Sequence, residues 1–113
     1  MSDAEQKLFS VLGFAMKAGK VRSGELSVEK AVKSGRAKLV AIDSGISRQS
    51  RARWQAVCDS CGIPLITADR LGRAIGKEAH MVACIADNGF AQMVLRAYKI
   101  LDPNFGGMVN GKE

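Results

Sequence analysis

Segments with helical periodicity alternate with short apolar runs along the chain, and this alternation is what most constrains the fold. Apolar residues recur every three or four positions in the helical segments, as in helices that bury one face. Leu39–Ile42 and Met81–Ala86 are instead continuously apolar, as in strands covered on both sides. No repeat or linker interrupts the pattern. It predicts one α/β domain, a three-layer α/β/α sandwich around a small mixed sheet.

Cap and turn residues predict where these elements begin and end. Ser2 and Glu5 have the spacing of a capping box, and Gly19 suits the end of the first helix. The other expected boundaries are a strand at Val21–Ser23, a second helix ending at Gly35, a third ending at Gly62, a strand from Pro64 to Ala68, a short helix capped by Asp69 and ending at Gly76, and a last helix capped by Asp87 or Asn88.

The buried stripes of two helices follow from the same spacing. The third helix should bury Trp54, Val57, Cys58 and Cys61, and the last should bury Phe90, Val94, Ala97 and Leu101. Asp102-Pro103 should stop the last helix, which makes residues 1–103 a single domain. Residues 104–113 hold three glycines and no periodicity, so we expect a flexible C-terminal tail.

The three cysteines do not form a disulfide framework, and no export signal or membrane span is visible. We therefore expect a reduced, cytoplasmic monomer with no membrane partner. The C-x-x-C motif of Cys58 and Cys61 closes a helix, where the dipole does not activate a thiol. Core packing is the favoured role for both cysteines, and no metal or cofactor is expected. A zinc site that adds His80 and Cys84 is the alternative.

The net charge of +6 is concentrated in one third of the chain. Residues 17–53 carry +7, and all other residues together carry −1. Such a cationic segment attracts polyanions, chiefly nucleic acid, although a solvated charged surface would have the same composition. From this segment Lys20, Arg22, Lys30, Lys33, Arg48 and Arg51 are expected to supply most of the affinity for a polyanion.

Motifs for catalysis are missing from the sequence. GRAIGK (residues 72–77) has one residue too few for a P-loop, and a single histidine without a nucleophile elbow supports no hydrolytic site. We therefore expect no enzyme. Two features favour an anionic ligand instead: arginines at the start of the third helix, and Ser23-Gly24 at the start of the second. An ordinary N-cap is the alternative for Ser23-Gly24.

Several motifs together resemble the L7Ae/L30e ribosomal protein family of kink-turn RNA binders. SGELSVEKAVKSGRAKLV (residues 23–40) resembles the family signature G-x-x-x-x-x-K-A-I-x-x-G-x-A-x-L-V. Cys58, Ile63-Pro64, Leu71-Gly72 and Gly76 follow in the family's order, and residues 76–91 are most similar to the bacterial YlxQ-like branch. The resemblance covers about residues 8–101 and implies an α/β/α sandwich that binds RNA without cofactor or catalysis.

The family's RNA surface combines the start of the second helix with the loop before the last strand. By position, this implies an RNA-binding role for Gly24, Glu25, Leu26, Ser27, Lys30, Ala79, His80 and Met81, next to Ser23. Kink-turn readers carry Asn-Glu where this chain has Leu26-Ser27, so the side chains that recognise sheared G·A pairs are absent. The predicted function is non-catalytic binding of structured RNA, kink-turn-like RNA included, in association with the ribosome or translation. An adaptor that binds an acidic protein through the same surface is the alternative.

Overall fold

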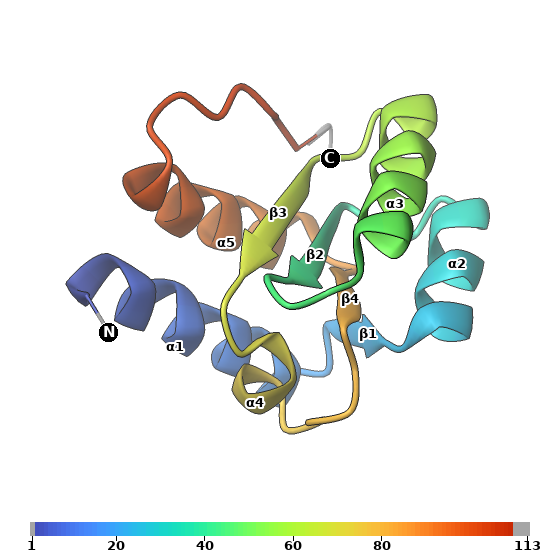
Figure 1. Ribbon diagram of the computed structural model, residues 1–113. Helices are drawn as coiled ribbons and strands as arrows, with labels where there is room; N and C mark the ends of the chain where they lie inside the picture. Colours follow the sequence, from blue (N-terminus) through green and yellow to red (C-terminus); the bar gives the residue numbers. More distant parts are fainter. Residues whose placement is uncertain (1, 110–113) are drawn as a thin grey trace.

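The computed structural model describes residues 2–109 and arranges them around a four-stranded sheet (Figure 1). Its elements in chain order are α1 (Asp3–Lys17), β1 (Val21–Ser23), α2 (Glu25–Lys33), β2 (Leu39–Asp43), α3 (Arg48–Cys61), β3 (Leu65–Ala68), α4 (Leu71–Ala74), β4 (Val82–Ile85) and α5 (Asn88–Leu101). Within these residues, no helix is long and apolar enough to cross a membrane.

The sheet is mixed, with the strand order β1-β4-β2-β3. Strands β2 and β3 are parallel, and β4 is antiparallel to both of its neighbours, β1 and β2. Because of these directions, β1, β2 and β3 all end at the end of the sheet where β4 begins. The segments that follow or precede these strand ends are therefore brought to one end of the molecule.

Helices cover both faces of the sheet, as Figure 1 shows. Leu39 and Ala41 of β2 face α1, α4 and α5 in one hydrophobic cluster. Val40 and Ile42, which alternate with them, face α2 and α3 in a second cluster around the fully buried Trp54. The alternation of side chains along a strand explains why a continuously apolar run serves both clusters. The expected three-layer α/β/α sandwich is confirmed.

Most of the expected helix caps are present. Ser2 and Glu5 form the capping box of α1, and the Asp87 carboxylate accepts a hydrogen bond from the Phe90 amide at the start of α5. Gly62 ends α3 in the left-handed conformation, with φ of 68°. Local sequence therefore located these ends correctly.

The cap predicted for α4 is wrong. Arg70, not Asp69, is the N-cap residue, and no side chain of its own turn caps the helix. The Asp43 carboxylate from the end of β2 instead accepts a hydrogen bond from the Leu71 amide at 2.9 Å. Asp43 also accepts one from the Gly45 amide, so one carboxylate fixes two loops at this end of the sheet.

Two residues of the predicted stripes are also exposed rather than buried. Cys61 is exposed in the last turn of α3, whereas Cys58 is fully buried, so core packing holds for only one of the two cysteines. Leu101 is 36% exposed at the end of α5. Both lie in terminal turns, where few neighbouring elements remain to cover a side chain.

The part of the expected tail that the structure describes packs against the domain. The Phe105 and Tyr98 rings meet edge to face with centroids 5.1 Å apart, and Val109 is 8% exposed in the cluster with α1 and α5. Asn104, Gly106 and Met108 are exposed, and both the boundary at residue 103 and the flexible tail remain predictions. Residues 110–113 of the predicted tail lie outside the described residues.

Candidate functional site

The candidate interface lies at one end of the sheet, where β1, β2 and β3 end and β4 begins. We define the candidate interface as the start of α2 (residues 24–27), the start of α3 (residues 47–51), α4 with Arg70, and the loop before β4 (residues 77–81). In open α/β sheets, ligands bind outside the carboxyl ends of parallel strands, which is where these segments lie.

His80 joins the loop before β4 to the start of α2. Its Nδ1 lies 2.7 Å from the Ser23 hydroxyl in a hydrogen bond that spans 57 residues of sequence. The Gly24 amide donates to the Val82 carbonyl at 2.9 Å, and a Cβ at Gly24 would lie 3.4 Å from the His80 ring. The structure therefore brings together the two segments that the resemblance implied. The binding role of the individual residues remains a prediction.

The start of α2 has no side-chain cap. Gly24 is its N-cap residue, whereas Ser2, Ser47 and Asp87 cap α1, α3 and α5. Since the first-turn amides of a helix have no intrahelical acceptor, the amides of residues 25–27 are left for another partner. The Ser23 hydroxyl does not supply one, because it is engaged by His80. These observations favour an open helix start over the ordinary Ser-Gly cap.

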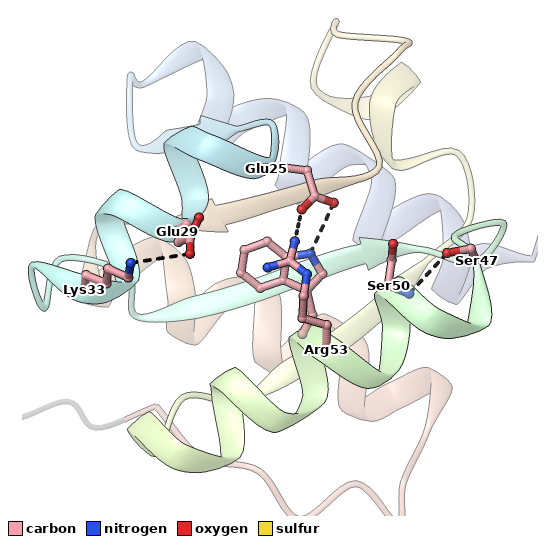
Figure 2. Close-up of polar contacts among 7 residues, drawn as sticks. Glu25, Glu29, Lys33, Ser47, Ser50 and Arg53 are labelled. Carbon is pink, nitrogen blue, oxygen red and sulfur yellow. Dashed lines mark hydrogen bonds and ion pairs between the residues drawn. The ribbon is translucent and has the colours of Figure 1, made fainter.

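Glu25 turns away from this opening and joins α2 to α3. Figure 2 shows its carboxylate accepting hydrogen bonds from the Arg53 guanidinium and from Trp54 Nε1, the latter at 3.4 Å. The Arg53 guanidinium also lies over the Trp54 ring, 4.7 Å from the centroid. Arg53 is thus neutralised within the protein, and the first turn of α2 presents Leu26 and Ser27 instead. Leu26 is 81% exposed.

The predicted cations of this region differ in how free they are. Lys30 and Arg48 are exposed, and neither has a carboxylate partner among residues 2–109. Arg51 is partly buried and donates to the Thr67 hydroxyl at 3.1 Å, which fixes α3 to β3. In the loop before β4, Ala79 is exposed and Met81 partly buried. Arg48 is therefore the predicted cation best placed for a ligand at the candidate interface, whereas Lys30 lies in the last turn of α2.

Two arginines that the sequence reasoning missed also belong to the candidate interface. Arg70 and Arg73 line a hollow of about 260 Å³ together with two carboxylates, Asp43 and Glu78, and with His80 and Met81. Both lie outside the basic stretch of residues 17–53, in a part of the chain with almost no net charge. Charge counted along the sequence did not find them, because β3 and β4 carry distant segments to the same end of the sheet.

Lys20, Arg22 and Lys33 do not join the candidate interface. Lys20 precedes β1 and lies at the opposite end of the sheet, where its carbonyl accepts a hydrogen bond from the Ala86 amide after β4. Lys33 ends α2 at that same end and pairs with Glu29 at 3.5 Å (Figure 2). Arg22 lies within β1, an edge strand. These three cations therefore lie apart from the candidate interface, and their role in binding remains a prediction.

The cysteines form neither a reactive pair nor the proposed zinc set. Burial, and then the neighbouring Cys61 and Asp59, raise the pKa of the Cys58 thiol to about 12. Cys58 and Cys61 lie in the last turn of α3, at the far end of the sheet from His80. Among residues 2–109, no group of three or more His, Cys, Asp or Glu residues is placed to hold a metal ion.

Several known proteins are similar to this chain in sequence or in fold. RNA-binding protein YlxQ of Bacillus subtilis (strain 168) is 37% identical over 90 residues, covering 77% of this chain and 90% of that protein. A Bacillus halodurans protein of unknown function matches with a TM-score of 0.77 and 33% identity, over 82% of this chain and 97% of that one. The Giardia lamblia 15.5kD RNA binding protein shares the fold, with a TM-score of 0.73 and 18% identity over 91% of each chain.

The family itself follows from a match over most of the chain. Residues 6–95 match the model of the ribosomal protein L7Ae/L30e/S12e/Gadd45 family. The match includes most of α1, all of α2 to α4, the four strands and the first half of α5. Together with the identity to the Bacillus subtilis relative, this match shows that the chain belongs to the ribosomal protein L7Ae/L30e/S12e/Gadd45 family.

Proposed function

We propose that this protein binds structured RNA at the candidate interface and catalyses no reaction there. The observation that carries the proposal is the uncapped start of α2 beside His80. Amides at a helix start attract anions, since their N–H groups and the helix dipole both favour negative charge. Gly24 has no side chain, so a phosphate can approach this backbone closely.

The surrounding cations fit the same ligand. Arg48 is exposed at the start of α3, and Arg70 and Arg73 are exposed at the adjoining hollow. Contacts between such residues and phosphates release counterions, which supplies affinity without reading the base sequence. Trp54, the single tryptophan of the sequence, is fully buried, so it offers no platform on which bases could stack. Phosphate contacts and RNA shape should therefore dominate recognition.

The family relationship supports an RNA ligand and its setting. The Bacillus subtilis relative is named an RNA-binding protein, and the family description is that of ribosomal proteins. We extend both to this chain and propose that it acts as a single copy in the cytoplasm, on ribosomal or other structured RNA. Its target includes kink-turn-like RNA, which presents a bent phosphate backbone to the helix start.

Leu26 and Ser27 set the expected specificity. Leu26 has no hydrogen-bonding side chain and is almost fully exposed at the start of α2. Base edges at this position can then be met only by apolar contact or by the Ser27 hydroxyl. We expect the double variant Leu26→Asn, Ser27→Glu, which restores the pair of the kink-turn readers, to bind a kink-turn RNA more selectively than the unmodified protein does.

Binding across a salt series tests the proposed function. A kink-turn RNA and a plain duplex of the same length are titrated with the protein, with Arg48→Gln, and with Arg96→Gln as the matched control. Arg96 is exposed on α5, which covers the other face of the sheet from α2. Arg48→Gln should weaken binding and lower the slope of log K against log salt by about 0.7 to 0.9, the value for one phosphate contact.

The outcomes separate the candidate functions. A steep salt slope that only Arg48→Gln reduces supports the proposal, and a preference for the kinked RNA adds specificity for that shape. No binding to either RNA near physiological salt would refute it. Capture of an acidic protein by the same surface would then favour the adaptor function.

A further inference from the structure

A second group of cations lies at the end of the sheet opposite the candidate interface. Lys20 and Lys38 precede β1 and β2, which are the two neighbours of β4. The Lys20 carbonyl accepts from the Ala86 amide, and the Lys38 amide donates to the Ile85 carbonyl, each at 2.8 Å. Since adjacent strands lie about 4.8 Å apart, these two lysine backbones are separated by about 10 Å.

Arg22 and Arg36 lie beside the same end of β4. Arg22 is the cross-strand partner of Cys84, and Arg36 occupies the turn between α2 and β2. Burial raises the pKa of the Cys84 thiol to about 11, and a backbone hydrogen bond from Arg22 and the charges of Arg22 and Arg36 oppose this rise. The Arg22 guanidinium lies 3.3 Å from the Gly19 carbonyl and the Arg36 Nε lies 3.1 Å from the Ser34 hydroxyl, in the turns that precede β1 and β2. We call Lys20, Arg22, Arg36 and Lys38 the far surface.

The far surface is not neutralised within the protein. Arg22 donates to the carbonyls of Gly19 and Val21, Arg36 to the Ser34 hydroxyl, and Lys38 to the Gly35 carbonyl. These acceptors are neutral, so the charges remain. Among residues 2–109, the ion pairs are Lys33 with Glu29 and Arg53 with Glu25, and both leave the far surface untouched. The Asp87 carboxylate at this end caps α5 by accepting from the Phe90 amide and keeps its charge, but it forms no ion pair with these cations among the described residues.

Structural roles account for only part of this charge. Lys17 and Lys33 lie in the last turns of α1 and α2, where the helix dipole favours cations. Lys20 and Lys38 lie beyond those turns, so the dipole does not explain them. A charge on an edge strand discourages sheet-to-sheet aggregation, which explains Arg22 alone. Arg22 and Lys38 also donate to the carbonyls of Gly19 and Gly35 beyond the ends of α1 and α2, and these bonds leave both charges without a carboxylate partner among residues 2–109.

The two cationic regions are too far apart to act as one. The six steps from Lys38 to Ser44 along β2 span about 20 Å, at about 3.3 Å per residue. This is more than two Debye lengths at physiological salt, where the Debye length is about 8 Å.

We propose that the far surface binds the phosphates of a second RNA segment, so that one copy of the protein holds two segments together. This inference rests on the proposed function.

Two matched variants test the second site. The triple variant Lys20→Gln, Arg36→Gln, Lys38→Gln removes three charges from the far surface, and Arg48→Gln, Arg70→Gln, Arg73→Gln removes three from the candidate interface. Both sets lie outside the buried core, and thermal unfolding of each variant checks its fold. The probe is an RNA hairpin of about 10 base pairs, because such a stiff duplex cannot bend around the domain.

The unmodified protein should bind two hairpins, as measured by sedimentation with labelled RNA, and each triple variant should bind one. The step lost in the far-surface variant should carry a salt slope of roughly 2 to 3, about 0.7 to 0.9 for each contact. One hairpin per protein, with affinity and slope unchanged in the far-surface variant, would overturn the second site alone. A single hairpin that both variants weaken would overturn it too, and no RNA binding at all would overturn the proposed function as well.

Discussion

Gly24→Ala tests how the start of α2 is built. The backbone at Gly24 has φ of 91° and ψ of 152°, a conformation that is close to exclusive to glycine. An alanine held there costs about 1 to 3 kcal/mol of strain. The added Cβ would lie 3.4 Å from the His80 ring, which is ordinary contact, so strain rather than a clash sets the cost.

Stability and binding should respond differently to this substitution. With a urea m-value of about 2 kcal/mol/M, the strain lowers the unfolding midpoint by roughly 0.5 to 1.5 M. The methyl group also stands between the first-turn amides of α2 and His80, where we place a phosphate. Loss of one hydrogen bond to a charged group costs about 1.5 to 3 kcal/mol, so RNA affinity should fall about 10- to 100-fold.

Gly35→Ala is the matched control. Gly35 has a positive φ of 76° beyond the end of α2, and a Cβ there meets nothing within 4 Å. It should lose about 1 to 2 kcal/mol of stability for its left-handed backbone and keep its affinity for RNA at the candidate interface. If Gly24→Ala binds the kink-turn RNA as tightly as Gly35→Ala does, the phosphate does not lie at the start of α2. An unchanged urea midpoint for Gly24→Ala would refute the strain.

Three further changes have definite expected results. Gly72→Ala places a methyl group 2.6 Å from a backbone carbonyl of the loop before β4, so it should lower both the urea midpoint and RNA affinity. Glu25→Ala leaves the buried Trp54 indole N–H without its acceptor and should cost about 1 kcal/mol in urea unfolding. The raised folded pKa values of Cys58 and Cys84 keep stability intact below pH 9 and reduce it as pH rises toward 11 to 12. Between pH 8 and 10, the free energy of urea unfolding should fall by about 1.4 kcal/mol for each thiol. In Cys84→Ala only the Cys58 contribution remains, so the fall should be about half as large.

Local patterns predicted those parts of the fold that local interactions determine. The capping box at Ser2, the glycine end of α3 and the Asp87 cap each depend on residues within a few positions of one another. The cap of α4 could not be found in this way. Its Leu71 amide is bound by Asp43, 28 positions earlier, and only the pairing of β2 with β3 brings the two together.

In the candidate interface too, local sequence predicts some features, and others depend on how the strands pair. The uncapped glycine at the start of α2 is visible in the sequence, but its neighbour His80 comes from 57 residues away through the pairing of β1 with β4. Only the family resemblance indicated that contact. Conversely, residues 17–53 form one basic stretch in the sequence and two separate surfaces in the structure. β2 crosses the sheet between Lys38 and Arg48, and charge composition contains no information about that crossing.

Strand direction also makes the two surfaces physically unlike. The transitions from β1 to α2, from β2 to α3 and from β3 to α4 occur at one end of the sheet, so these helix starts face the candidate interface. The ends of α1, α2 and α3 face the opposite end of the sheet. An anion at the candidate interface is therefore attracted by the uncapped amides of α2 as well as by side chains, whereas the helix start beside the far surface, that of α5, is already capped by the Asp87 carboxylate. At an RNA concentration that just saturates both sites of the unmodified protein, neutralising three cations should leave either site empty, with the larger loss of affinity at the second.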